Sequence, residues 1–138
     1  MKQKLHNGTC LIVDRYAYSG VAYTAAKPGF DLEWCKQCDK GLPKPDLVCF
    51  MDTKKLNLNS RECFGNERYE VNEFQTLVYN NFKKLFNLEN TKEETKTDDC
   101  LLINASDTIE SIHSKILNNV LELIKSNRSY SKQLNLLW

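Results

Sequence analysis

The sequence predicts an α/β fold in which helices flank a parallel sheet. Three short apolar runs, Thr9–Val13, Asp46–Asp52 and Cys100–Asn104, are continuous rather than alternating. Such runs are typical of strands that are buried on both faces of a parallel sheet. Helical patterns separate the runs, and this alternation favours the α/β class. The predicted order is strand, two helices, strand, loop, helix, strand, helix.

Composition excludes several classes of protein. The 138 residues carry 19 Lys and Arg against 18 Asp and Glu, so the net charge of +1 argues against a nucleic-acid partner. Hydrophobic residues make up 41%, enough for one core rather than a disordered chain. There is no apolar run of about 18 residues and no signal-like N-terminus. We therefore expect no membrane partner, free cysteine thiols, and a cytoplasmic location, with the nucleus and mitochondrion left open.

We assign residues 1–138 to one partial domain. The beginning of the chain is unusual for a complete domain. Residues 2–5 resemble the last turn of a helix that Asn7–Gly8 terminates, and the strand 9–13 follows at once. Three strands make a thin sheet for helices on two faces. We therefore expect part of a larger fold, truncated here, upstream of Met1.

Two helices are predicted between the first and second strands. Residues 16–27 form the first, although Gly20 costs ~1 kcal/mol relative to Ala, so a close approach to its backbone is expected. Pro28–Gly29 ends this helix. Asp31 is then expected to cap a short helix that continues to about Asp39.

The second half of the chain contains a loop and two amphipathic helices. Residues 53–66 are polar and irregular, and 89–99 form a charged linker. Asp107 is predicted to cap the last helix, with Glu110 completing a capping box. The apolar stripes of the two helices are Val71, Phe74, Val78, Phe82 and Leu85 in the first, and Ile109, Ile112, Ile116, Val120 and Leu123 in the second.

Asp14 and Arg15 directly follow the first predicted strand. A carboxylate there lies at the carboxyl edge of the sheet, where α/β proteins bind ligands, and in nucleotide-dependent kinases such an acid helps to hold Mg²⁺. Arg15 offers a planar fork for phosphate. The alternative is that Asp14 caps the next helix and pairs with Arg15.

Two further segments are candidate binding elements. Ser19, Gly20 and Tyr23 lie on the first long helix, where Tyr23 could contact a base or sugar; ordinary helix packing is the alternative. Residues 61–70 contain two arginines, a glycine and a tyrosine, which suit a lid over phosphates or a solvated loop.

Cys35 and Cys38 form a C-x-x-C motif, but Cys35 is predicted inside a helix rather than at its N-terminus after a strand. A redox function is therefore kept only as a minor alternative. A zinc site would need four ligands, and the sequence has no second C-x-x-C. The isolated His6 and His113 are expected at the surface.

Several of these strings together closely resemble the motifs of eukaryotic thymidylate kinases, in family order over essentially the whole chain. The strings are Leu11–Tyr23, with Asp-Arg-Tyr followed by Ser-Gly-Val-Ala; Trp34–Gln37 followed by Asp39 and Gly41–Val48; Phe64–Glu70; and Asn104–Ser106. The resemblance implies a three-layer P-loop NTPase-type kinase fold. It also implies transfer of the γ-phosphoryl group of ATP to dTMP, giving dTDP, with Mg²⁺ and usually as a homodimer.

The resemblance also implies roles for individual residues. Asp14 would be the Mg²⁺-associated acid, acting through water, and Arg15 would hold the dTMP phosphate near the transferred group, so these two are the catalytic candidates. The implied dTMP pocket comprises Arg15, Ser19, Gly20, Tyr23 and Tyr69. The implied ATP contacts are Arg61, Asn104, Ala105, Ser106 and Asp107. The lid-like segment 53–70 would contribute Arg61, Phe64, Gly65 and Arg68.

The sequence departs from the family pattern in one important respect. The P-loop G-x-x-x-x-G-K-[ST] is absent, as are the family's Asp-Arg pair in that loop and its thymine-reading Phe and Arg. Asn104 and Cys38 also replace a family Asp and Pro. We expect the isolated chain to lack kinase activity, since phosphoryl transfer depends on that phosphate cradle.

Three hypotheses follow. The sequence is an incomplete version of an ordinary thymidylate kinase, a short non-catalytic product that binds or dimerises with the full-length kinase, or, least favoured, a redox protein that uses Cys35 and Cys38.

Overall fold

The computed structural model describes residues 1–52, 72–88, 97, 100–126 and 134–138. The helices and strands are α1 (Lys2–His6), α2 (Ala17–Ala25), α3 (Leu32–Lys36), the 3-10 helix η1 (Gln37–Asp39), β1 (Val48–Asp52), α4 (Asn72–Leu85), β2 (Cys100–Asn104) and α5 (Ile109–Ser126). The predicted α/β order is therefore confirmed for every helix and for the second and third strands. Among the described residues, no helix combines the length and apolar character needed to cross a membrane.

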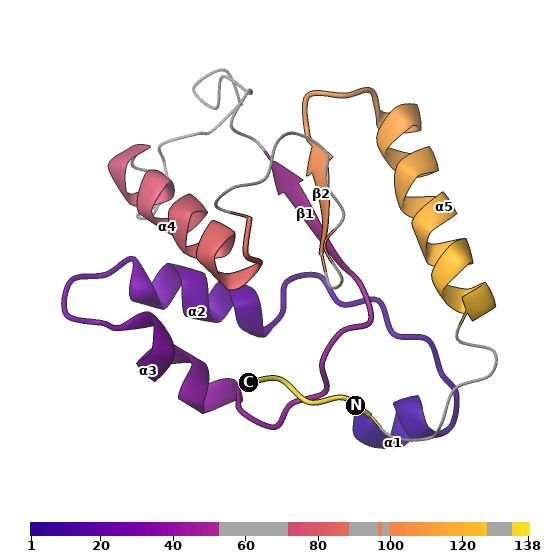
Figure 1. Ribbon diagram of the computed structural model, residues 1–138, viewed down its shortest axis with the longest axis horizontal. Coiled ribbons are helices and arrows are strands. Elements are labelled where there is room, and N and C mark those ends of the chain that lie inside the picture. Colours follow the sequence, from indigo (N-terminus) through magenta and orange to yellow (C-terminus); the bar gives the residue numbers. More distant parts are fainter. Residues whose placement is uncertain (53–71, 89–96, 98–99, 127–133) are drawn as a thin grey trace.

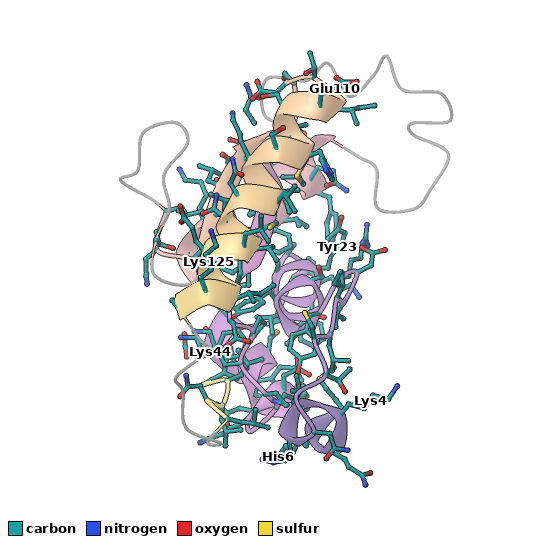
Figure 2. The ribbon with its side chains drawn as sticks, turned by 90° about the vertical axis from the view of Figure 1, so that its right-hand side faces the viewer. Lys4, His6, Tyr23, Lys44, Glu110 and Lys125 are labelled. Atoms are coloured by element: carbon teal, nitrogen blue, oxygen red, sulfur yellow. The ribbon has the colours of Figure 1, made fainter. Side chains whose placement is uncertain are left out.

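The sheet consists of β1 and β2, which are parallel, with Val48 opposite Cys100 and Asp52 opposite Asn104. Figure 1 shows α2 and α4 on one side of the two strands and α5 on the other, and Figure 2 shows α5 from its own side. The two views together give three layers, helix, sheet and helix. This arrangement confirms the predicted parallel sheet and its layering.

The predicted first strand is wrong. Residues 9–13 form no strand and pair with neither β1 nor β2, and Ile12 is 98% exposed. An apolar run becomes a strand only where another strand satisfies its main-chain N–H and C=O groups. The described chain brings no such partner alongside this segment, so its sequence preference alone does not form a ladder. Asp14 consequently does not follow a strand of this sheet.

The main core lies between the sheet and the α2–α4 layer. Phe50 of β1 contacts Phe82 of α4 and Phe86, the residue after α4, with ring centroids 5.1 and 5.9 Å apart. Tyr18 of α2 adds its ring at 4.8 Å from Phe86. Alternate β1 side chains point the other way, and Met51 remains 39% exposed there. Period-two alternation therefore directs one face of β1 into this aromatic cluster.

Helices α2 and α4 pack through small residues. Ala22, Ala26 and Val78 form a buried cluster, and Ala22 is fully buried. Asn81 of α4 donates a hydrogen bond from Nδ2 to the Ala22 carbonyl oxygen (3.0 Å). The described part of the predicted α4 stripe lines this contact; Val71 lies outside the described residues.

The two predicted helix caps have different outcomes. Asp31 accepts a hydrogen bond from the Trp34 amide (2.9 Å), as predicted for the cap of α3. The cap of α5 is Thr108 rather than Asp107, because Thr108 Oγ1 accepts from the Ser111 amide (3.2 Å). Asp107 is instead held by Asn104 and Lys115 within the preceding turn.

The predicted stripe on α5 is only half-buried. Ile112, Ile116, Val120 and Leu123 are partly covered, whereas Ile109 is 82% exposed. Ile109 is the first residue of α5, directly after its cap. The apolar stripe is therefore covered from Ile112 onward but not at Ile109.

Candidate functional site

Arg15 lies in the turn that leads into α2, and its backbone is left-handed (φ +56°). Non-glycine residues adopt this conformation uncommonly, and it often marks a functional position. Both Asp14 and Arg15 are exposed. The predicted alternative, in which the Asp14 side chain caps α2, does not occur, because Tyr16 is the N-cap residue and no side chain caps the helix.

The guanidinium of Arg15 lies over the ring of Tyr23, with Cζ 5.8 Å from the ring centroid. The structure therefore brings together the two residues that the sequence predicted to hold a phosphate and a sugar. Tyr23 is itself half-buried against Phe74 of α4, with ring centroids 6.1 Å apart. A guanidinium over an aromatic face is stabilised by the ring quadrupole and is restricted in orientation. Packing from α4 thus orients the tyrosine, and the tyrosine orients the arginine.

Ser19 and Gly20 lie one turn before Tyr23 on α2. Ser19 is half-buried and Gly20 is exposed. A Cβ added to Gly20 would meet nothing within 4 Å, so no described residue makes the predicted close approach to this backbone. Gly20 instead leaves open surface beside Tyr23, where a ligand could reach the helix.

The carboxyl ends of β1 and β2 form a second polar group that the sequence reasoning missed. Asp52 lies opposite Asn104 across the ladder, and its carbonyl oxygen accepts from the Ala105 amide (2.9 Å). The hydroxyl of Tyr79 donates to Asp52 Oδ2 (3.3 Å). Burial, with added contributions from the charge and hydrogen bond of Asp52, raises the pKa of Tyr79. Asp52 ends an apolar strand just as Asn104 does, and that shared signal could have identified it.

The turn after β2 is held by its own side chains. Asn104 Oδ1 accepts from the Ser106 amide (3.1 Å), and Asn104 Nδ2 donates to Asp107 Oδ1 (3.0 Å). Lys115 of α5 donates to Asp107 Oδ2 (2.7 Å). Hydrogen bonds among its own side chains and with Lys115 therefore hold the turn 104–107, which the resemblance assigns to ATP contacts. Its role toward adenine stays a prediction.

The cysteine motif lies where the sequence predicted, inside the helical segment after Asp31. Cys35 is buried (5% exposed), and burial, followed by the nearby Asp31 and Cys38, raises the pKa of its thiol. A redox cysteine requires the thiolate, so this environment works against such a role. Among the described residues, no three His, Cys, Asp or Glu side chains are grouped as a metal site.

The remaining predicted site residues, Arg61, Phe64, Gly65, Arg68 and Tyr69, lie outside the described residues together with the rest of the lid-like segment 53–70. The described part of the site therefore has two centres. One comprises Arg15 and Tyr23 at the start of α2, and the other comprises Asp52, Tyr79 and Asn104 at the carboxyl ends of the strands.

A solved thymidylate kinase from Candida albicans has the same arrangement. It superposes with a TM-score of 0.67 at 27% identity, covering 99% of this chain and 67% of that one. The fold is thus that of the P-loop kinases, an α/β class with a parallel sheet between helices.

The family follows from sequence. A family model described as thymidylate kinase matches residues 1–116, which is most of the chain, so this chain belongs to the thymidylate kinase family. Curated thymidylate kinases from Danio rerio and Homo sapiens are 49% and 45% identical over 116 residues, or 84% of this chain. The Arabidopsis thaliana thymidylate kinase is 42% identical over all 138 residues.

The chain spans about half the length of these curated relatives, 51% for the fish and human proteins and 48% for the plant protein. The match covers the region of Arg15, Tyr23 and the turn 104–107. The activity of a whole thymidylate kinase is therefore a proposal for this chain.

Proposed function

We propose that this chain carries the dTMP-binding part of a kinase that transfers the γ-phosphoryl group of ATP to dTMP, giving dTDP. The observation that carries the proposal is the contact between Arg15 and Tyr23, because it places a phosphate-binding group and an aromatic face together. The two residues also lie in the family motif that resembles the dTMP site.

The phosphate of dTMP would meet three favourable features at the start of α2. The Arg15 guanidinium presents parallel N–H donors that match phosphate oxygens. No side chain caps the N-terminus of α2, so the phosphate could approach that end of the helix. The helix dipole adds partial positive charge at the same end. In a transfer reaction, these groups would fix the dTMP phosphate oxygen that attacks and would stabilise charge on the transferred group.

The nucleoside of dTMP would extend along α2 past Ser19 and Gly20 toward Tyr23. The Tyr23 ring would lie beside the deoxyribose and disfavour a 2′-hydroxyl. Tyr69 would complete this pocket from the lid segment.

ATP and Mg²⁺ fit the chain only in part. Mg²⁺ commonly takes one or two carboxylates and completes its shell with water and phosphates, so the single exposed Asp14 carboxylate suits such a site, through water. When bound, the ion would neutralise phosphate charge. Arg61 and the turn 104–107 would contact ATP. The described residues contain no glycine-rich phosphate cradle, so Asp14 and Arg15 alone are not expected to support catalysis.

The first test measures binding of dTMP to the purified chain by isothermal titration calorimetry. We expect saturable binding that is weakened about tenfold or more in Arg15→Ala, because a hydrogen bond to a charged group contributes about 1.5–3 kcal/mol. Lys125→Ala is the matched control, since it removes a cation from the end of α5 (Figure 2). Equal dTMP affinity in the parent and Arg15→Ala would refute the assigned role.

A coupled assay for dTDP tests the activity of the chain itself. We expect no dTDP from the chain alone. Turnover by the pure chain would refute that expectation and leave the dTMP assignment standing.

The alternative is a non-catalytic partner that pairs with a full-length kinase. It is supported by the sequence of residues 16–27, which resembles a dimer-interface helix of the family. Comigration of the chain with full-length thymidylate kinase in size-exclusion chromatography tests this alternative. The elution volume of the chain alone tests for a homodimer. Both the kinase proposal and the non-catalytic alternative place the protein in the cytoplasm, which cell fractionation tests.

A further inference from the structure

The last residues of the chain return to the core and pair with the segment after η1. We call residues 134–138 the C-terminal strap. Leu137 exchanges backbone hydrogen bonds with this segment, donating to the Leu42 carbonyl (2.9 Å) and accepting from the Gly41 amide (3.2 Å). The Lys44 amide donates to the Asn135 carbonyl (2.8 Å), and Figure 1 shows the yellow strap beside the chain that follows α3.

The strap is also anchored by two side chains. Leu137 is 3% exposed and belongs to the core cluster that contains Tyr18. Trp138 meets the Tyr18 ring edge-on, with centroids 5.2 Å apart. Lys36 of α3 covers the Trp138 ring, with Nζ 5.3 Å from its centroid. Such packing exceeds what a frayed terminus makes.

The strap is linked to the start of α2 directly through Tyr18 and indirectly through Tyr16. Tyr18 in the first turn of α2 lies against Trp138. Tyr16, the N-cap residue, donates its hydroxyl to the Pro43 carbonyl (3.1 Å) in the very segment that the strap pairs with. Both residues lie within three positions of Arg15, whose backbone is left-handed.

We propose that the C-terminal strap is a positioning element for the dTMP site: by holding Tyr18 and, through Pro43, Tyr16, it sets the start of α2 and thereby the placement of Arg15 over Tyr23. The proposal rests on the proposed function of Arg15 and adds residues to it. The family-model match ends at residue 116, whereas the match to the Arabidopsis thaliana relative covers all 138 residues and includes the strap.

The test compares the full chain with a chain that ends at residue 133, titrating dTMP by isothermal titration calorimetry. We expect the dissociation constant for dTMP to rise about fivefold or more without the strap, the range typical of coupled sites. Leu137→Ala is expected to act in the same direction. Trp138→Phe is expected to retain the parent affinity, because a phenyl ring still meets Tyr18 and the indole N–H of Trp138 has no hydrogen-bond partner.

A control separates positioning from loss of stability. Ile103→Ala empties a buried site on β2 (1% exposed), and among the described residues Ile103 is not a member of the core clusters that contain Leu137, Tyr18 and Ala22. It should lower the melting temperature to an extent similar to Leu137→Ala while the affinity for dTMP stays that of the parent. If both variants lose affinity in proportion to stability, the strap is only structural and the proposal is overturned.

A fluorescence experiment gives an independent readout in the folded protein. Trp34 and Trp138 are the two tryptophans, so Trp34→Phe leaves Trp138 as the sole reporter. Addition of dTMP should change Trp138 emission in the Trp34→Phe variant and leave it unchanged in the Trp34→Phe, Arg15→Ala double variant.

The outcomes distinguish the two proposals. If the full chain binds no dTMP, the proposed function fails and the strap inference fails with it. If the full chain binds dTMP but the chain ending at 133 binds equally well, only the strap inference is overturned.

Discussion

Two substitutions at Arg15 separate the effect of its backbone strain on stability from the effect of its guanidinium on dTMP binding. Its φ of +56° costs a non-glycine residue about 1–2 kcal/mol, whereas glycine adopts it freely. Glycine also has greater freedom in the unfolded chain, which costs about 0.4–1 kcal/mol. We therefore expect Arg15→Gly to be more stable than Arg15→Ala by about 0.5–1 kcal/mol. The contact with Tyr23 is lost in both variants, so it cancels.

The comparison is made by chemical denaturation and thermal melting of both variants. For a chain of this size the difference corresponds to about 2–4 °C in melting temperature. The control pair is Ser114→Gly and Ser114→Ala, at an exposed helical position of α5, where glycine should instead be less stable by about 1 kcal/mol.

The affinity for dTMP should not follow the stability difference between the two Arg15 variants. Both Arg15→Gly and Arg15→Ala lose the guanidinium, so both should bind dTMP at least about tenfold more weakly. If Arg15→Ala proves as stable as Arg15→Gly, or more so, the left-handed backbone is not a property of the folded protein and the strain argument fails.

Three further predictions concern single hydrogen bonds. Tyr79→Phe removes the bond to Asp52 and should cost about 1 kcal/mol at pH 8. Burial and Asp52 raise the pKa of Tyr79 above its ordinary 10.0, so the folded protein keeps this proton to a higher pH than the unfolded chain does. The free energy of unfolding should therefore fall as the pH rises above 10.0. Tyr79→Phe should make that fall shallower in alkaline denaturation curves. Asp31→Ala should cost about 1 kcal/mol by removing the cap of α3, Asp31→Asn should retain most of it, and an equal loss in both would contradict capping. Thr108→Ala should likewise lower the free energy of unfolding by about 1 kcal/mol, and Thr108→Ser should change it little. An unchanged melting temperature in Thr108→Ala would contradict Thr108 as the cap of α5.

Local signals in the sequence determined much of the secondary structure. The continuous apolar runs before Asp52 and Asn104 are strands because their residues favour a pleated, covered surface. Asp31 is a cap because its short carboxylate reaches an amide three residues on. The order of the motifs along the chain also indicates the family, since each motif is a contiguous run of residues.

Tertiary structure decided what local signals could not. Residues 9–13 have the same apolar character as β1, but they form no strand. A strand requires a neighbouring strand to pair with its main-chain groups, and the local sequence pattern does not show whether the fold places one there. Thr108 rather than Asp107 caps α5, and Lys115, eight residues further along the chain, holds the Asp107 carboxylate.

The candidate site was divided in the same way. The sequence by itself determined that Arg15 and Tyr23 carry phosphate- and ring-binding chemistry in a thymidylate kinase motif. Only the tertiary structure decided that they touch, that Tyr79 reaches Asp52, and that Trp138 returns to Tyr18. The physical reason is that residue chemistry is local, whereas contact between distant residues depends on how helices and strands pack around a shared core.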